Sequence, residues 1–154
     1  MSDAASPRIP APGYPDLRLS IFFPAYYDEL NIGKVVEGAI RVVEEMGLRD
    51  YEIIVVEDGS PDRTGEVADE LAARHERVRV IHHERNLGYG AALRTGFQAA
   101  RYEYDFYTDG DNQFDLRELR KFIALLPYTD IVAGFRIKKQ YSAYRKFTSW
   151  IYNH

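Results

Sequence analysis

Cysteine is absent from the 154-residue sequence, which excludes disulfide bonds, thiolate metal sites and catalysis by a thiol. No stretch approaches the roughly 20 consecutive apolar residues that cross a bilayer as a helix. The formal net charge is −4, so no overall basic field favours nucleic acid as a partner. The four histidines lack metal-ligand spacing, and we expect His82 and His83 to end a strand rather than to act in catalysis.

Two common phosphate-binding glycine motifs are also missing. The segment Gly88-Tyr89-Gly90-Ala91-Ala92 lacks the third glycine of a dinucleotide-binding fingerprint, and it follows the third expected strand instead of the first. The sequence contains no Gly-x-x-x-x-Gly-Lys-Ser/Thr loop either. A nucleotide site in this chain must therefore be built in another way.

Hydrophobic residues make up 45% of the chain and charged residues 29%, which is ordinary for a globular protein. The length suits one domain with a substantial core. Prolines at positions 7, 10, 12 and 15 predict a disordered leader over residues 1–16.

From residue 17 onward, short apolar runs alternate with amphipathic stretches. Strands are expected at residues 19–23, 53–56, 78–81, 104–108 and 131–133, and helices at residues 32–43, 67–72, 90–100 and 116–126. Asn31 is a candidate cap for the first helix, and Gly47 is its expected stop. Continuously apolar strands joined by amphipathic helices predict an α/β fold with a mainly parallel sheet and helices on both faces.

Polar segments follow each of the first four expected strands, at residues 24–29, 57–62, 85–90 and 108–115. In open parallel sheets, ligands bind beyond the carboxyl ends of the strands. We therefore expect these four segments to meet at one edge of the sheet and to form the site.

The fourth segment carries the most specific chemistry. Asp109 and Asp111 are separated only by Gly110 at the tip of an expected strand, so both carboxylates can face one hard cation. Mg²⁺ and Mn²⁺ favour this environment and take further ligands from water and substrate phosphates. The pattern indicates a metal–diphosphate site; the alternative is an Asp/Gly/Asn turn that only links a strand to a helix.

Four motifs in this order carry a family resemblance: Pro24-Ala25-Tyr26-Tyr27-Asp28, residues 55–64, Asn86-Leu87-Gly88, and Asp109-Gly110-Asp111-Asn112-Gln113. Over about residues 18–150 the chain resembles family 2 glycosyltransferases of the GT-A fold, above all the dolichol-phosphate mannosyltransferase group. Members of that group transfer a sugar from a nucleotide donor to a polyprenyl phosphate. The family usually has Asn at Tyr27, Glu at Asp28 and Asp at Glu57.

The resemblance implies roles for particular residues. Those expected to contact the nucleotide or its phosphates are Pro24, Tyr26, Asp28, Val56, Asp58, Gly110, Arg136 and Arg145. Within that set, Asp58 would meet the base edge, and Arg136 and Arg145 would meet phosphate. Asp109 and Asp111 would hold the metal, with Gln113 as a third ligand or water holder. The catalytic residues it implies are Asp109, Asp111 and Arg136.

The resemblance also implies an organisation and a reaction. Residues 17–135 would form the nucleotide-sugar-binding GT-A domain, and residues 136–154 would begin the acceptor- or membrane-facing region of a chain truncated at its C-terminus. The donor would be a GDP- or UDP-sugar with Mg²⁺ or Mn²⁺. The acceptor, a polyprenyl phosphate, would be glycosylated with inversion at the cytoplasmic face of a membrane. Two alternatives stay open: a family 2 transferase acting on a sugar hydroxyl, and a non-catalytic fragment that binds nucleoside diphosphate.

The last residues of the chain are basic and aromatic. Residues 131–154 contain no acidic side chain, and their cations are Arg136, Lys138, Lys139, Arg145 and Lys146. Interleaved aromatics, with Trp150 among them, suit peripheral contact with an anionic membrane surface. The alternative is a helix that packs its aromatics on the core. Nucleic acid is not expected as a partner, because the polar sheet edge is acidic.

Overall fold

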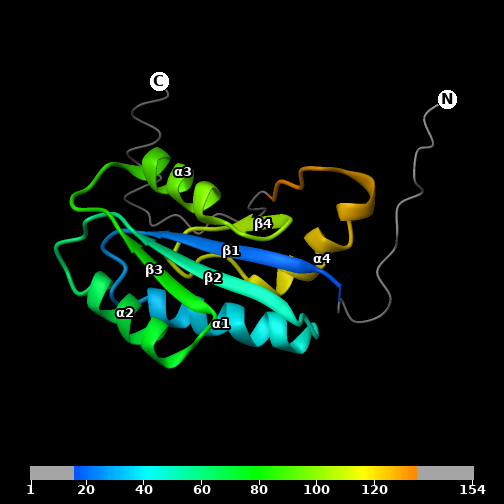
Figure 1. Ribbon diagram of the computed structural model, residues 1–154, viewed down its shortest axis with the longest axis horizontal. Helices are drawn as coiled ribbons and strands as arrows, with labels where there is room; N and C mark the ends of the chain where they lie inside the picture. The colour runs from blue at the N-terminus through cyan, green and yellow to red at the C-terminus, as the bar shows by residue number, and fades with distance from the viewer. Residues whose placement is uncertain (1–15, 135–154) are drawn as a thin grey trace, which may run out of the picture.

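The computed structural model describes residues 16–134 of the chain. Strands and helices alternate along it as the sequence predicts (Figure 1). In chain order the elements are β1 (Arg18–Ala25), α1 (Ile32–Glu45), β2 (Asp50–Glu57), α2 (Thr64–Arg74), β3 (Val78–His82), α3 (Tyr89–Ala99), β4 (Tyr104–Tyr107), the 3-10 turn η1 (Leu116–Glu118), α4 (Leu119–Ile123) and the 3-10 turn η2 (Leu126–Tyr128).

The four strands form one sheet in the order β3-β2-β1-β4, and every neighbouring pair is parallel. β1 lies in the interior of the sheet, where Leu19 pairs with Tyr51 of β2 on one side and with Tyr104 of β4 on the other. Each connection must therefore cross over the sheet, and the helices provide these crossovers. The predicted parallel α/β architecture is confirmed.

Helices cover both faces of the sheet, with α1 and α2 on one face and α3 on the other (Figure 1). Successive side chains of β1 point to opposite faces of the sheet, as they do in any strand. Ile21 and Phe23 belong to the larger core cluster with α1 and α2, whereas Phe22 packs with Ile54 and Ala92 under α3. The strand is continuously apolar because both of its faces are covered.

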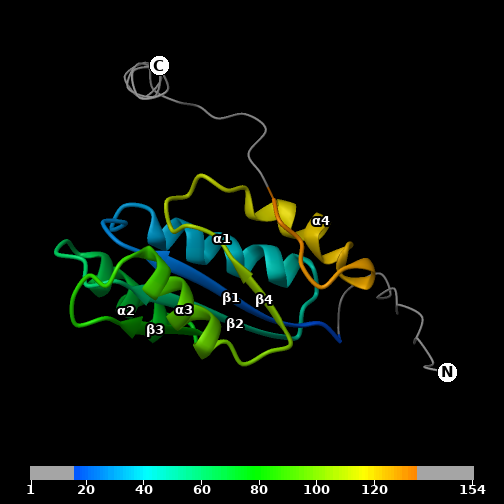
Figure 2. The same cartoon turned by 90° about the horizontal axis from the view of Figure 1, so that it is seen from above.

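The helix predicted over residues 116–126 is instead broken into η1, α4 and η2. Leu116, Leu119 and Ile123 are buried as the periodicity indicated. Pro127 lies in the first turn of η2, and proline disfavours helical backbone at the residue before it, which opposes a regular helix as far as residue 126. α4 lies beside the C-terminal part of α1 (Figure 2), where Arg120 forms an ion pair of 2.8 Å with Glu45.

The prediction of a fifth strand at residues 131–133 is wrong. Residues 131–134 adopt no strand conformation, and Ile131 is 81% exposed. An apolar run becomes a strand only where it can form backbone hydrogen bonds with a neighbouring strand. Within residues 16–134, nothing pairs with the outer edge of β4. The expected leader, Arg136, Arg145 and the basic aromatic segment fall outside the described residues.

No helix in the described part of the chain combines the length and the apolar character needed to cross a membrane.

Candidate functional site

The polar loops after β1, β2, β3 and β4 meet at the carboxyl edge of the sheet, as the sequence predicts. The loops after β1, β2 and β3 gather at the left-hand end of the sheet in Figure 1. Hydrogen bonds join these four loops in a closed ring: first to second, second to third, third to fourth and fourth back to first. These hydrogen bonds hold the four loops of the candidate site against one another.

The loops after β1 and β2 are joined through two hydroxyl groups. Ser60 Oγ accepts a hydrogen bond from the backbone N–H of Tyr27, and Thr64 Oγ1 accepts one from the backbone N–H of Asp28, both at 2.9 Å. The same two hydroxyls donate to Asp62 Oδ1, at 2.5 and 2.6 Å. Burial alone would raise the pKa of Asp62, but these hydrogen bonds outweigh it and leave the pKa lowered. The ionised Asp62 therefore fixes the hydroxyls that hold the first loop.

Tyr27 occupies an unusual backbone conformation, with φ of 58°. This left-handed region is unfavourable for most side chains but is tolerated by Asn. Asn is the residue that the family resemblance leads one to expect at this position, so the departure at Tyr27 introduces local strain. The hydrogen bond from its backbone N–H to Ser60 helps to hold the conformation.

Asp58 is the link between the second and third loops. Its side chain lies in the interior, with the residue only 3% exposed. Oδ1 accepts hydrogen bonds from His83 Nδ1 at 2.6 Å and from the backbone N–H of Leu87 at 2.9 Å, and Oδ2 accepts one from the backbone N–H of Gly88 at 2.9 Å. Burial raises the pKa of Asp58, yet these three donors lower it below the ordinary value. Asp58 is therefore an ionised anchor for the loop that precedes α3.

The environment of Asp58 also fixes the state of His83. Because an ionised carboxylate only accepts hydrogen bonds, Nδ1 of His83 must carry the proton that is shared with Asp58. Nε2 lies 2.9 Å from Thr95 Oγ1 in α3, which can donate to it. His83 thus ties the end of the sheet to α3, a contact that the sequence did not predict.

A carboxylate offers about four acceptor positions, and three of those on Asp58 are filled by protein donors. The fourth, on Oδ2, is the position through which Asp58 would meet a base edge. That role stays a prediction. Val56, also expected near the nucleotide, is fully buried in the core beneath α3.

The loop after β4 returns to β1 and brings Asp109 and Asp111 near enough to Asp28 to act on it electrostatically. The backbone N–H of Gly110 donates to Pro24 O at 3.3 Å, and a Cβ at Gly110 would lie 3.3 Å from Asp28 Oδ2. Burial raises the pKa of Asp28, the hydrogen bond from the Tyr26 N–H opposes this rise, and the negative charges of Asp111, Asp62 and Asp109 add to it. The net result is a raised pKa for Asp28, because it lies half-buried in a negative field.

This acidic arrangement fits a divalent cation bound together with a diphosphate. Within residues 16–134, no three His, Asp or Glu side chains lie close enough to enclose a metal ion unaided. Mg²⁺ characteristically takes only one or two carboxylates and completes its shell with water and phosphate oxygens. Asp109 and Asp111 supply that number, and a cation beside them would relieve the repulsion that acts on Asp28.

Asp111 is held by its own loop. Its Oδ1 accepts the backbone N–H of Gln113 at 2.9 Å. Asn112, between them, has φ of 57°, a left-handed conformation that Asn tolerates. The backbone of Gln113 therefore orients Asp111, whereas metal ligation by the Gln113 side chain stays a prediction.

Tyr89 joins the third loop to the fourth. Its hydroxyl donates to Asp109 Oδ1 at 2.9 Å, although Tyr89 is the first residue of α3 and Asp109 follows β4. Burial and the hydrogen bond to the negative Asp109 raise the pKa of Tyr89 to about 12. The sequence contains one signal for this contact, an aromatic residue placed between two glycines at the start of a helix, but no pattern that names its partner.

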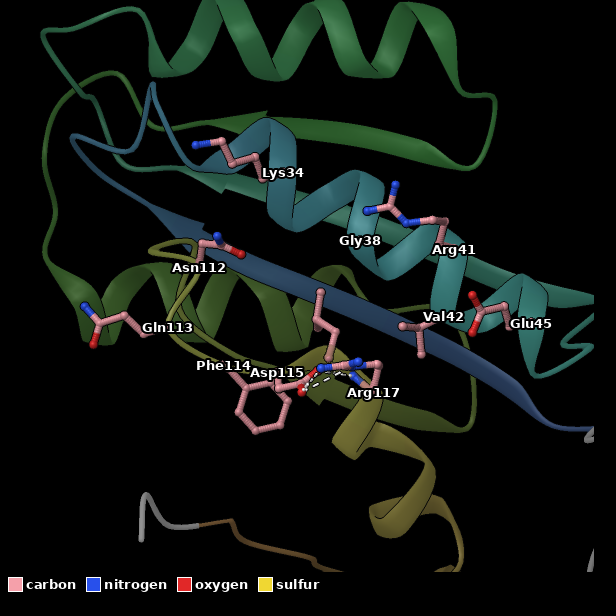
Figure 3. A pocket seen from close by; sticks show the side chains of 11 residues that line it. Lys34, Gly38, Arg41, Val42, Glu45, Asn112, Gln113, Phe114, Asp115 and Arg117 are labelled. Atoms are coloured by element: carbon pink, nitrogen blue, oxygen red, sulfur yellow. Dashed lines mark hydrogen bonds and ion pairs between the residues drawn. The ribbon is translucent and has the colours of Figure 1, made fainter. Parts of the chain in front are cut away.

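A groove of about 540 Å³ lies next to this site, between α1 and residues 112–117 (Figure 3). Lys34 and Arg41 stand on its α1 side, and Gln113 and Arg117 stand on the other. Arg117 is paired with Asp115 at 2.7 Å. The groove lies beside the loop after β4, but neither Asp109 nor Asp111 lines it.

The structure thus brings most of the sequence-predicted residues to one edge. Pro24 lies buried beneath Gly110, and Tyr26 stands at the rim, 42% exposed, next to Asp28. Arg136 and Arg145 lie outside the described residues and are not placed.

Comparison with known proteins gives consistent matches. The model of the family "Glycosyl transferase family 2" matches residues 20–153. Glycosyltransferase AglD of Haloferax volcanii is 37% identical over 108 residues, which is 70% of this chain and 17% of the relative. The undecaprenyl-phosphate 4-deoxy-4-formamido-L-arabinose transferase of Pseudomonas aeruginosa is 31% identical over 143 residues, 91% of this chain and 42% of the relative. The chain therefore spans less than half the length of either relative.

Among solved structures, one similar fold is that of Mycobacterium tuberculosis glucosyl-3-phosphoglycerate synthase in complex with Mn²⁺, uridine diphosphate and phosphoglyceric acid. The TM-score is 0.59 at 21% sequence identity, and the match covers 75% of this chain and 40% of that one. At this identity the likeness establishes a shared fold.

Proposed function

Because this chain belongs to glycosyl transferase family 2 and has the GT-A fold, we propose that it is the donor-binding part of an enzyme that transfers a sugar from a nucleotide-sugar to a polyprenyl phosphate. The observation that carries this proposal is the closed ring of four loops, with Asp28, Asp109 and Asp111 gathered at the carboxyl edge of the sheet. The acceptor class is supported by the Pseudomonas relative, whose name specifies undecaprenyl phosphate and which aligns with 91% of this chain.

The donor nucleotide is proposed to lie against the loops after β1 and β2. Tyr26 offers a partly exposed ring on which a base can stack, next to Asp28, whose carboxylate can accept hydrogen bonds from the base or the ribose. Asp58 would use its remaining acceptor position toward the base edge. The donor is a GDP- or UDP-sugar, and the structure of similar fold with bound uridine diphosphate is consistent with the second of these.

The diphosphate is proposed to lie at Asp109 and Asp111 with Mg²⁺ or Mn²⁺, and Gln113 would hold a ligand or a water. When bound, the cation supplies positive charge that neutralises the diphosphate and stabilises it as a leaving group. The residues of the chain contribute position: Gly110 lets the loop approach β1, and the Gln113 backbone orients Asp111.

The proposed reaction is a displacement at the anomeric carbon with inversion. The bond from that carbon to the acceptor phosphate oxygen forms as the bond to the nucleoside diphosphate breaks. A phosphate oxygen is already anionic, so the step needs no strong general base. Arg136 and Arg145 are proposed to meet phosphate groups, and the basic aromatic segment 136–154 to make peripheral contact with the cytoplasmic face of a membrane.

Replacement of Asp111 tests the metal–diphosphate site. We expect Asp111→Asn to weaken binding of GDP or UDP in the presence of Mn²⁺ by at least about tenfold, because one anionic ligand is lost. Isothermal titration with Mn²⁺ and again with EDTA measures this effect, and circular dichroism checks the fold.

Asp115→Asn is the matched control, since this exposed carboxylate pairs with Arg117 a few residues beyond the metal pair. It should bind the nucleotides as the parent chain does. Equal nucleotide affinity with and without metal in the parent chain would contradict the assignment.

A further inference from the structure

The hydrogen bond between Tyr89 and Asp109 connects two parts of the site that serve different groups of a nucleotide. Tyr89 begins α3, directly after the loop held by Asp58, while Asp109 lies on the loop after β4. The contact is 2.9 Å long and runs from the tyrosine hydroxyl to Oδ1 of the carboxylate.

The backbone at Tyr89 is fixed from both directions. On the N-terminal side, the N–H groups of Leu87 and Gly88 donate to the buried Asp58. On the C-terminal side, Gly88 O accepts from the N–H groups of Ala91 and Ala92 at 2.9 and 3.1 Å and so starts the helix. The hydroxyl of Tyr89 therefore reaches Asp109 from a backbone that is hydrogen-bonded on both sides.

Hydrogen bonds and the covalent chain together connect Asp58 to Asp109. His83 and the backbone N–H of Gly88 bond to Asp58, Gly88 is followed directly by Tyr89, and the Tyr89 hydroxyl bonds to Asp109. One end lies where the base edge is expected and the other lies at the expected metal ligand. A shift of the loop held by Asp58 would move the Tyr89 hydroxyl, which donates to the carboxylate of Asp109.

We propose that Tyr89 is a positioning residue, which orients Asp109 for the cation and couples that carboxylate to the loop held by Asp58. The inference rests on the proposed function, since it deepens the metal–diphosphate site. Carboxylates that bind metals are commonly oriented by a second hydrogen bond, which fixes their rotation and lowers the ordering cost of metal binding. The Tyr89 hydroxyl provides such a bond to Asp109, as the Gln113 N–H provides one to Asp111.

The expected effect is moderate because Tyr89 is 55% exposed. Loss of an outer-shell hydrogen bond to a metal ligand typically costs 10–100-fold in metal affinity. Water can partly replace an exposed tyrosine hydroxyl, so we expect a value at the lower end, about tenfold.

Tyr89→Phe tests the inference because it removes the hydroxyl and keeps the ring. The affinity of the full chain for GDP and for UDP is measured by isothermal titration with saturating Mn²⁺ and again with EDTA. The ratio of the two dissociation constants is the metal coupling. We expect Tyr89→Phe to reduce this ratio about tenfold while the affinity in EDTA stays unchanged. Tyr128→Phe, which removes a hydroxyl from an exposed tyrosine in η2, should leave both values unchanged.

The outcomes separate this inference from the proposed function. A parent chain with metal coupling and a Tyr89→Phe variant with the same or greater coupling would overturn the positioning role and leave the metal site intact. A parent chain without metal coupling would overturn both. Equal losses of affinity in Mn²⁺ and in EDTA would show that Tyr89 has only a structural role and would also overturn the inference.

Discussion

Replacement of Asp58 by Asn should destabilise the fold substantially, although the two side chains have nearly the same shape. The carboxylate accepts three hydrogen bonds, from His83, Leu87 and Gly88. In the variant the amide oxygen can occupy the Oδ1 position and keep the first two donors. The amide NH₂ would then occupy the Oδ2 position and face the N–H of Gly88, one donor against another.

The size of the loss follows from these contacts. A buried donor left without an acceptor costs about 1–3 kcal/mol, and two charge-assisted hydrogen bonds that become neutral lose about 1 kcal/mol each. Leu87 and Gly88 are not fully buried, so water recovers part of this loss. We therefore expect the free energy of unfolding to fall by about 2–4 kcal/mol.

Urea unfolding followed by circular dichroism at neutral pH measures this change. Asp50→Asn serves as the control, because Asp50 is exposed at the start of β2, and its effect should stay within about 0.5 kcal/mol. The lowered pKa of Asp58 adds a pH signature. The stability contributed by the Asp58 carboxylate is fully present above the unfolded pKa of about 3.9 and is lost as the pH falls through the folded pKa. The unfolding free energies of the parent chain and of Asp58→Asn should therefore converge in acid. A loss below about 1 kcal/mol at neutral pH would refute the reasoning.

Two further predictions concern α3 and the end of β3. Gly96→Ala should destabilise the protein by about 1–3 kcal/mol in the same urea assay, because the added Cβ would clash with the buried Phe22 ring, whereas Gly90→Ala, which has open space around it, should not be destabilising. His82 is partly buried, which lowers its pKa, but its hydrogen bonds to Asp69 and Glu57 outweigh burial and leave the pKa raised. The stability that these contacts of His82 add is therefore fully present below about pH 6.5 and is lost as the pH rises through the folded pKa. The loss of unfolding free energy caused by His82→Gln should be larger at about pH 6 than at about pH 9. A loss that grows with pH would contradict this assignment.

The parts of the fold that the sequence predicts correctly are those set by local pattern. The apolar runs of β1 and β2 and the helical period of α1 require only the burial of side chains that are neighbours in the chain. The meeting of the polar loops at one edge could be predicted from the parallel sheet alone, because the carboxyl ends of parallel strands lie at the same edge. Residues 131–133 were assigned to a strand by the same local criterion, which cannot tell whether a partner edge exists.

The contacts that the sequence did not predict depend on strand register. β2 and β3 pair Glu57 with His82, so the next residues, Asp58 and His83, emerge side by side. The same reasoning applies to the pairing of β1 with β2, where the register sets Ser20 beside Glu52 and lets the two side chains form a 2.9 Å hydrogen bond. A shift of one residue would separate either pair, and no residue type in a single sequence reports the register of parallel strands.

The pairing of β4 with β1 has a consequence for the order in which a growing chain can fold. β1, α1 and β2 leave the ribosome early and can pack on one another, but β4, which directly precedes Asp109 and Asp111, arrives only after α3 has been made. Until then β1 has an unpaired edge, and Phe22 lacks the stacked ring of Tyr107. An open strand edge beside exposed aromatic surface favours association with other chains. The nascent protein therefore exposes this edge of β1 until β4 pairs with it, and the same pairing brings Asp109 and Asp111 to the carboxyl edge of the sheet.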